Sequence, residues 1–425
     1  MKPTSSKSLK SSPGMRPLTR RSLLGLAATG ALAATLLPFP ATAMAAPATP
    51  VRAELPAPTG PHAIGTYSTR LVDRSRHDPW VGGQPYRELM VSVWYPAAKG
   101  AAHGHRLAPY MTPGAARAWD AAAGQHGIPK GAVDWSGTRT HAYAGAPVDA
   151  TGGRRPVLLY TSGAGDPRTW NTSLVEELAS RGYIVVTVDH TYEAPGVEFP
   201  GGRVVDNAPL MKAFAEADKE GKVPALLKKV GDVRAADDSF VLDSLSSLPK
   251  GLGNVMNLQQ VGAVGQSAGG IAAAQTMYQD RRVKAGINMD GTLEYNQEPK
   301  GTNFMPVARH GLDRPFLLMG SDRPTEPAWK EFLSRSTGWK RNVTMRGSQH
   351  QTYTDLAPIL PQTGVGRKVI EKNIGTVQPK RATAAQRAYV TSFFDHWLRD
   401  RDDHLLDGPS ARWPEMKFAG MQLGK

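Results

Sequence analysis

Gly265-Gln266-Ser267-Ala268-Gly269 stands between the apolar run Val261–Val264 and the helix-like stretch Ile271–Tyr278. A serine hydroxyl becomes an effective nucleophile only when a base takes its proton, and it must project clear of the backbone. A tight turn between a buried strand and a helix meets this need, because the flanking glycines permit a bend that larger side chains would block. The stretch therefore predicts a nucleophile, Ser267, at a strand-to-helix turn.

Short apolar runs alternate with amphipathic stretches on both sides of this turn. Buried strands are predicted at Pro156–Tyr160, Tyr183–Val188, Val283–Met289, Pro315–Met319 and Asn342–Met345. Helices are predicted at Thr169–Ser180, Asp232–Leu248 and Thr383–Leu398. Uniformly apolar strands that alternate with helices indicate a parallel sheet covered on both faces.

Two further strands are expected earlier, at Gly65–Val72 and Glu88–Tyr95, joined by a polar turn region. Antiparallel strands at the start and parallel strands afterwards match the sheet of an α/β-hydrolase. In that fold class the acid and then the histidine follow the serine along the chain. The segments near residues 97–155 and 192–231 show little periodicity, so we expect irregular wall or lid insertions around the site.

The N-terminus has the layout of an export signal. Six lysines and arginines lie within the first 21 residues, with no acidic residue before Glu54. The apolar segment Leu23–Leu37 follows, and small residues end at Ala45. The paired Arg20 and Arg21 resemble a twin-arginine address, with an ordinary secretory signal as the alternative. We expect residues 1–45 to be a cleaved signal, residues 46–61 a linker and residues 62–425 one secreted hydrolase domain.

Composition excludes several kinds of site. The chain has no cysteine, which rules out disulfides, thiolate metal ligands and a cysteine nucleophile. The formal net charge of +14 falls to about +8 without the leader, which could favour peripheral contact with anionic lipid surfaces. The basic residues are scattered, without the aromatic interleaving typical of nucleic-acid binding. No stable protein partner is implied.

The base that activates Ser267 should be a histidine later in the chain. His350 follows the strand Asn342–Met345 after a short turn, so it should lie at the carboxyl end of the sheet, where open α/β folds bind ligands. The other three histidines downstream of Ser267 fit less well, because they are expected at the wrong sheet edge, inside the final helix and in a charged run: His310, His396 and His404. His350 is the predicted base.

Two carboxylates compete to orient this imidazole. Asp290 ends the strand after the serine helix, and Asp322 ends the next strand. Either could fix the histidine tautomer and stabilise the imidazolium, and spacing does not separate them.

Substrate oxyanions require preorganised N–H donors. One should be the backbone of Ala268, directly after the nucleophile, and the other should come from Thr161–Gly165. We predict Ala164 as the second donor. A phosphate-binding loop is disfavoured because this glycine stretch lacks the required lysine.

Several segments together resemble the platelet-activating factor acetylhydrolase group of α/β-hydrolases, the plasma-type, calcium-independent phospholipases A2 and their bacterial relatives. The matching segments keep the same order along the chain and are Gly65-Thr66-Tyr67, Arg87–Pro96, Ser162–Gly165, Gly265–Gly270, Ile287–Gly291 and Gly347–Gln351. The resemblance implies that Asp290 is the acid, with Asp322 as the alternative, and it supports His350 and Ala164 in their roles. Gln266 departs from the histidine of the animal enzymes, which leaves the substrate open.

The resemblance implies a secreted serine ester hydrolase that removes a short or oxidised sn-2 acyl chain from a phospholipid through an acyl-enzyme. This chemistry calls for no metal or organic cofactor. Two alternatives stay open: a broader extracellular lipase, cutinase or polyester hydrolase, and a catalytically inactive binding protein on the same fold.

Overall fold

The computed structural model describes residues 49–296 and 301–419. The expected export signal, residues 1–45, lies outside this part of the chain. Within the expected linker, Val51 forms an isolated bridge with Val133, and both Ala53 and Leu55 are buried in an apolar cluster. The later part of that segment therefore packs against the domain.

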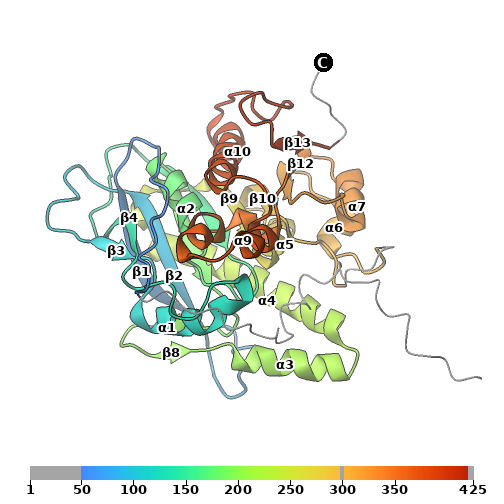
Figure 1. Cartoon of the computed structure of the whole chain (residues 1–425), viewed down its shortest axis with the longest axis horizontal. Helices are drawn as coiled ribbons and strands as arrows, with labels where there is room; N and C mark the ends of the chain where they lie inside the picture. Colours follow the sequence, from blue (N-terminus) through green and yellow to red (C-terminus); the bar gives the residue numbers. More distant parts are fainter. Residues whose placement is uncertain (1–48, 297–300, 420–425) are drawn as a thin grey trace, which may run out of the picture. The chain divides into compact units, whose positions relative to one another are not determined.

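An eleven-stranded sheet dominates the described residues, in the order β13-β12-β11-β10-β9-β5-β6-β2-β1-β4-β3 (Figure 1). Its strands are β1 (Ile64–Asp73), β2 (Arg87–Pro96), β3 (Leu107–Pro109), β4 (Arg139–Ala144), β5 (Arg155–Thr161), β6 (Ile184–Asp189), β9 (Met256–Gln266), β10 (Val283–Met289), β11 (Phe316–Gly320), β12 (Lys340–Met345) and β13 (Met416–Phe418). A separate pair is formed by β7 (Val197–Glu198) and β8 (Val204–Val205).

Strand directions confirm the predicted fold class. β1 and β2 pair antiparallel, and β2 runs antiparallel to β6. From β6 through β5, β9, β10 and β11 to β12, all neighbours are parallel. The protein therefore has the α/β-hydrolase fold, with all the predicted strands present and the serine turn near the middle of the sheet.

Helices cover both faces of this sheet. They are α1 (Pro113–Ala122), α2 (Thr172–Ser180), α3 (Ala208–Lys219), α4 (Val223–Ser244), α5 (Ala268–Gln279), α6 (Pro306–His310), α7 (Pro327–Arg335), α8 (Leu356–Ile359), α9 (Arg367–Ile374) and α10 (Pro379–Arg399). Short 3₁₀ helices are η2 (Ala123–His126), η3 (Leu245–Ser247), η4 (Gly253–Val255), η5 (His350–Tyr353) and η6 (Leu360–Thr363). None of the helices in the described ranges is long and apolar enough to cross a membrane.

Successive side chains of β5 pack into two different apolar clusters, one on each face of the sheet. Val157 and Leu159 belong to the cluster that contains α4 and α5, whereas Leu158 and Tyr160 belong to the cluster that contains α2 and α10. Because successive strand residues point to opposite faces, an unbroken apolar run is what a sheet buried on both sides requires.

Both segments hold regular elements where the sequence predicted irregular chain, and their role as walls or a lid of the site stays a prediction. Residues 97–155 hold α1 and two added strands, β3 and β4, and their Trp119 and Trp135 are buried. Residues 192–231 hold α3 and the first turns of α4. Short strands and an alanine-rich helix carry little periodic signal, and α3 buries only Leu210, so neither segment shows an apolar stripe.

Candidate active site

Ser267 lies at the sharp turn between β9 and α5, with φ 56° and ψ −124°. A side chain at Gly269 would overlap the carbonyl oxygen of Thr161, and one at Gly265 would overlap the backbone of Gly269. The Ser267 N–H donates to Met289 O at 2.8 Å, which ties the turn to the end of β10. The two glycines are thus required by close packing, as the sequence predicted.

His350 begins η5, after β12, and its side chain is about one quarter exposed. Its Nδ1 lies 2.6 Å from Asp290 Oδ2. A carboxylate only accepts, so Nδ1 carries the proton and Nε2 is left as the basic nitrogen of the neutral ring. The structure therefore brings Asp290 and His350 together in the geometry that orients a general base.

Asp290 is buried at the end of β10 and is held from several sides. The Ser321 N–H donates to its Oδ1 at 2.8 Å, and the Ser321 hydroxyl donates to its Oδ2 at 3.1 Å. Arg323 Nη2 lies 2.9 Å from Oδ2. Burial alone raises the pKa of Asp290, but the hydrogen bond from His350, the charge of Arg323 and the hydrogen bond from Ser321 N outweigh it and hold the pKa below its ordinary value. The carboxylate therefore stays ionised beside the imidazole.

Asp322 occupies a different position. Its Oδ2 accepts a hydrogen bond from Gly347 N at 2.7 Å, and its Oδ1 lies 3.4 Å from Lys417 Nζ. The side chain is exposed and makes no hydrogen bond with His350. Asp322 thus braces the turn that precedes the histidine loop.

Gln266 links the serine turn to this loop. Its Nε2 lies 3.3 Å from His350 Nε2 and donates to the His350 carbonyl at 3.1 Å. The hydroxyl of Ser267, the next residue, makes no hydrogen bond within the described ranges, and Ser267 is 9% exposed. Gln266 therefore joins the serine turn to the histidine loop, and its amide lies against His350 Nε2, the nitrogen that would take the serine proton in a triad.

The predicted oxyanion donors lie on two backbone segments. Ala268 is the first residue of α5, so its N–H has no partner within the helix. Ala164 lies in an exposed turn after β5. A methyl group on Gly163 would sit 3.4 Å from Ser267 Cβ and 2.8 Å from Gln266 Oε1, so this loop directly faces the serine turn.

Two buried pairs that sequence reasoning missed support the loop after β5. Arg234 of α4 donates from Nη1 to Ser162 O at 2.8 Å and is paired with Glu193 at 2.6 Å. Asp166 Oδ1 lies 3.2 Å from His126 Nε2. The available signal was the charge of Arg234 at a position of α4 that should be apolar, since buried charges are rarely tolerated without a partner.

The remaining downstream histidines lie elsewhere. His310 is exposed at the end of α6 and stacks on Tyr278. His396 lies 3.2 Å from Asp402. His404 is exposed and, with Asp402 and Asp407, forms a cluster with metal-ligand spacing. Exposed acidic clusters of this kind are common without a metal, and nothing else at this cluster indicates an ion.

Comparison with known proteins gives a consistent picture. Residues 51–197 match the family model described as platelet-activating factor acetylhydrolase, isoform II. A probable 1-alkyl-2-acetylglycerophosphocholine esterase of Arthroderma benhamiae is 29% identical over 86% of this chain and 93% of that protein. The platelet-activating factor acetylhydrolase of Gallus gallus is 24% identical over 60% of this chain and 66% of its own length.

A solved structure is also similar. The ferulic acid esterase from Streptomyces cinnamoneus is 37% identical, with a TM-score of 0.71, and the match covers 87% of this chain and 99% of that one. All of these relatives are named as ester hydrolases, and the solved one shares the fold of this chain. The chain is therefore a platelet-activating factor acetylhydrolase-like α/β-hydrolase, related to the ferulic acid esterase, and its relatives support a carboxylic ester hydrolase.

Proposed function

We propose that the protein is a serine ester hydrolase that works through an acyl-enzyme formed on Ser267. The observation that carries this proposal is the 2.6 Å contact of His350 Nδ1 with Asp290, which leaves Nε2 on the side of the serine turn. In the proposed reaction, the Ser267 hydroxyl attacks the ester carbonyl while His350 Nε2 takes its proton. The same proton then goes to the alcohol that leaves.

The negative charge that develops on the carbonyl oxygen would be held by the N–H groups of Ala268 and Ala164. Water then attacks the acyl-enzyme with His350 again as the base, and Ser267 is released. Asp290 keeps the imidazole in the correct tautomer and stabilises the imidazolium in both halves of the reaction. No step of this scheme calls for a metal or an organic cofactor.

For the substrate, we propose a phospholipid with a short or oxidised sn-2 acyl chain. The similarity to the Arthroderma benhamiae esterase over 93% of that protein supports this choice. Hydrolysis of a ferulate ester is the second candidate, favoured by the 37% identity to the Streptomyces cinnamoneus enzyme. A broader lipase, cutinase or polyester hydrolase activity is a third.

Two measurements test the proposal. A fluorophosphonate should label Ser267, and the Ser267→Ala variant should not be labelled. Absence of an adduct on the wild type would favour an inactive binding protein instead. A substrate panel of an sn-2 acetyl phospholipid, methyl ferulate, an aliphatic polyester and p-nitrophenyl esters then separates the candidates. Preference for methyl ferulate or the polyester over the phospholipid would overturn the substrate proposal while leaving the nucleophile in place.

We also propose export from the cytoplasm, on the basis of the basic leader and apolar segment in residues 1–45. N-terminal sequencing of protein from the culture medium should give a mature chain that starts close to Ala45. Retention of the full leader on intracellular protein would contradict this.

A further inference from the structure

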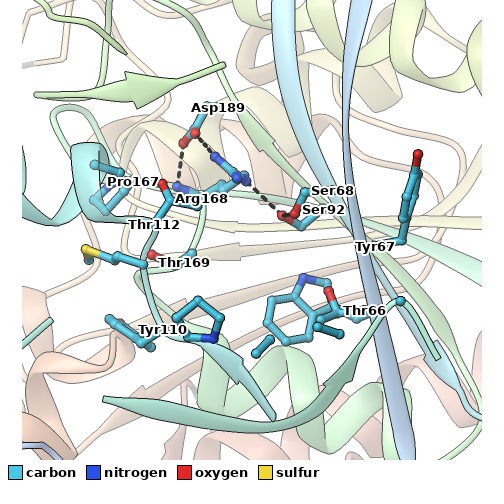
Figure 2. Close-up of a pocket in the computed structure, with 17 residues that line it drawn as sticks. Thr66, Tyr67, Ser68, Ser92, Tyr110, Thr112, Pro167, Arg168, Thr169 and Asp189 are labelled. Carbon is cyan, nitrogen blue, oxygen red and sulfur yellow. Dashed lines mark hydrogen bonds and ion pairs between the residues drawn. The ribbon is translucent and has the colours of Figure 1, made fainter. Parts of the chain in front are cut away.

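A cavity of about 210 Å³ lies beside the N-terminal strands and is lined by none of the proposed catalytic residues (Figure 2). Part of its wall is one face of the β1–β2 ladder, where Thr66 pairs with Trp94 and Ser68 pairs with Ser92. These residues are two apart on each strand, so all four side chains point to the same side of the sheet.

The rest of the wall comes from segments that are distant in the sequence. Tyr110 and Met111 precede α1, Ala115 lies on α1, and Pro167 follows the loop that carries Ala164. Figure 2 shows Tyr110 on the opposite side of the cavity from the Ser68 and Ser92 pair. These side chains are largely apolar, so the body of the cavity suits an apolar molecule.

Arg168 and Asp189 supply the charged part of the lining, and Arg168 is 7% exposed. Its Nε donates to Ser92 Oγ at 2.8 Å, and its Nη1 is paired with Asp189. Figure 2 shows the guanidinium between Asp189 and the two serines. Nη2 makes no hydrogen bond to any residue in the described ranges, so one donor group of this buried arginine is left available.

A second polar group of the lining also lacks a partner. Thr66 is 7% exposed, and its Oγ1 is buried without a hydrogen bond in the described structure. Buried hydroxyl groups are normally paired, because an unpaired one loses its hydrogen bonds to water without replacement. Thr66 and Arg168 therefore both line this cavity and both carry a donor without a partner; Thr66 Oγ1 itself is covered in this structure and turns toward the cavity by rotation about χ1.

We propose that this cavity binds a small neutral molecule with an apolar or aromatic body and one carbonyl oxygen, such as an aromatic ester. The size is adequate, since an apolar cavity of about 150 Å³ holds benzene. A neutral ligand fits because Asp189 already balances the charge of Arg168, and a carboxylate would be buried without a counter-charge. The carbonyl oxygen accepts a hydrogen bond from Arg168 Nη2 and, after rotation of Thr66 about χ1, a second one from the Thr66 hydroxyl.

The test uses the full chain with Ser267→Ala, so that esters are not cleaved and the result does not depend on the proposed catalytic function. Binding of methyl benzoate, benzoate and toluene is measured by ligand-observed NMR titration. Methyl benzoate should bind with a Kd of roughly 1 mM, as expected for a fragment of this size. Benzoate should bind at least about ten-fold more weakly, because of its charge.

Two variants locate the site. Ala115→Leu fills the cavity and should weaken the binding of methyl benzoate at least about ten-fold. Ala121→Leu, at an exposed position of the same helix, should leave this affinity unchanged. Thr66→Val keeps the side-chain shape and removes the hydroxyl. It should weaken the binding of methyl benzoate about five-fold and leave the affinity for toluene unchanged. If Ala115→Leu does not fold, Thr66→Val decides.

Three results would overturn the proposal. No binding of methyl benzoate would mean that the cavity holds water only. Binding that neither Ala115→Leu nor Thr66→Val weakens would place the ligand elsewhere, including beside residue 267. Benzoate binding as tightly as methyl benzoate would show that the site is not selective for a neutral carbonyl compound.

Discussion

The side-chain amide of Gln266 lies 3.3 Å from His350 Nε2, the ring nitrogen that faces away from Asp290. The same amide donates to the backbone carbonyl of His350 at 3.1 Å. The residue before the proposed nucleophile thus holds the histidine loop against the serine turn. In the proposed reaction this amide occupies the lone pair that Ser267 would need, so it would have to move away when the serine gives up its proton.

Introducing a negative charge at Gln266 should lower the activity more than replacing its amide with an apolar side chain. Gln266→Glu places a carboxylate beside Nε2, which would hold the protonated imidazole and block proton transfer from Ser267. We expect kcat/KM on p-nitrophenyl acetate to fall at least about 100-fold. Gln266→Leu removes the amide that competes for His350 Nε2 and the hydrogen bond to the His350 carbonyl. It should lower kcat/KM by less than about ten-fold. Equal losses in the two variants would contradict this role.

Substitution of the two candidate acids should have different effects on turnover. Asp290→Asn should lower kcat by about three to four orders of magnitude, because the amide favours the wrong tautomer of His350. Asp322→Asn should keep most of the activity, because that side chain braces Gly347 rather than the imidazole. Steady-state kinetics on both variants, with thermal unfolding as a check of the fold, decides. The reverse order of losses would overturn the assignment of the acid.

A side chain at Gly163 should lower the activity. A methyl group there would lie 2.6 Å from Asp166 Oδ2 and 2.8 Å from Gln266 Oε1, so the loop or the glutamine must move. We expect Gly163→Ala to lower kcat by about 10- to 1000-fold through displaced oxyanion donors, with a smaller change in KM. Gly366→Ala, at an open position, is the control. Full activity of Gly163→Ala would show that this loop takes no part in the reaction.

Glu326 should make stability depend on pH. Burial raises the pKa of this carboxyl from 4.5 to about 7, and its Oε1 has no hydrogen bond among the described residues. Between these values the folded state binds more protons than the unfolded state, so stability falls as pH rises from about 4.5 to 7.

The Glu326→Gln variant isolates this contribution. Relative to the variant, the wild type should lose on the order of 1 to 3 kcal/mol of unfolding free energy between about pH 4.5 and pH 7.5. Urea unfolding of both proteins at the two pH values measures the difference, and other titrating groups cancel in the comparison. A wild-type-to-variant difference that does not change with pH would contradict the raised pKa.

The central part of the fold is readable from the sequence because its strands are buried on both faces. β10 begins and ends at the predicted residues, Val283 and Met289, since an apolar run there has clear limits. β13 was missed because three residues, Met416–Phe418, carry no periodic pattern. α3 was missed because it is mostly exposed and buries only Leu210.

In the candidate site, too, some residues could be predicted from the sequence and others could not. Ser267 and His350 stand at the ends of recognisable strands, so chain order was enough to propose them together. Gln266, Asp166 and Arg234 were not found, because their contacts depend on how separate loops fold over the sheet. No sequence motif predicts that a glutamine or a buried ion pair will support the site.

Ser267 has a positive φ of 56° with ψ −124°, and Asp290, on the neighbouring strand end, also has a positive φ of 60°. Such conformations cost on the order of 1 to 3 kcal/mol for residues other than glycine. Thermostabilisation campaigns that score melting temperature alone would therefore drift toward glycine at both places. A library for this enzyme should be selected on turnover and heat resistance together.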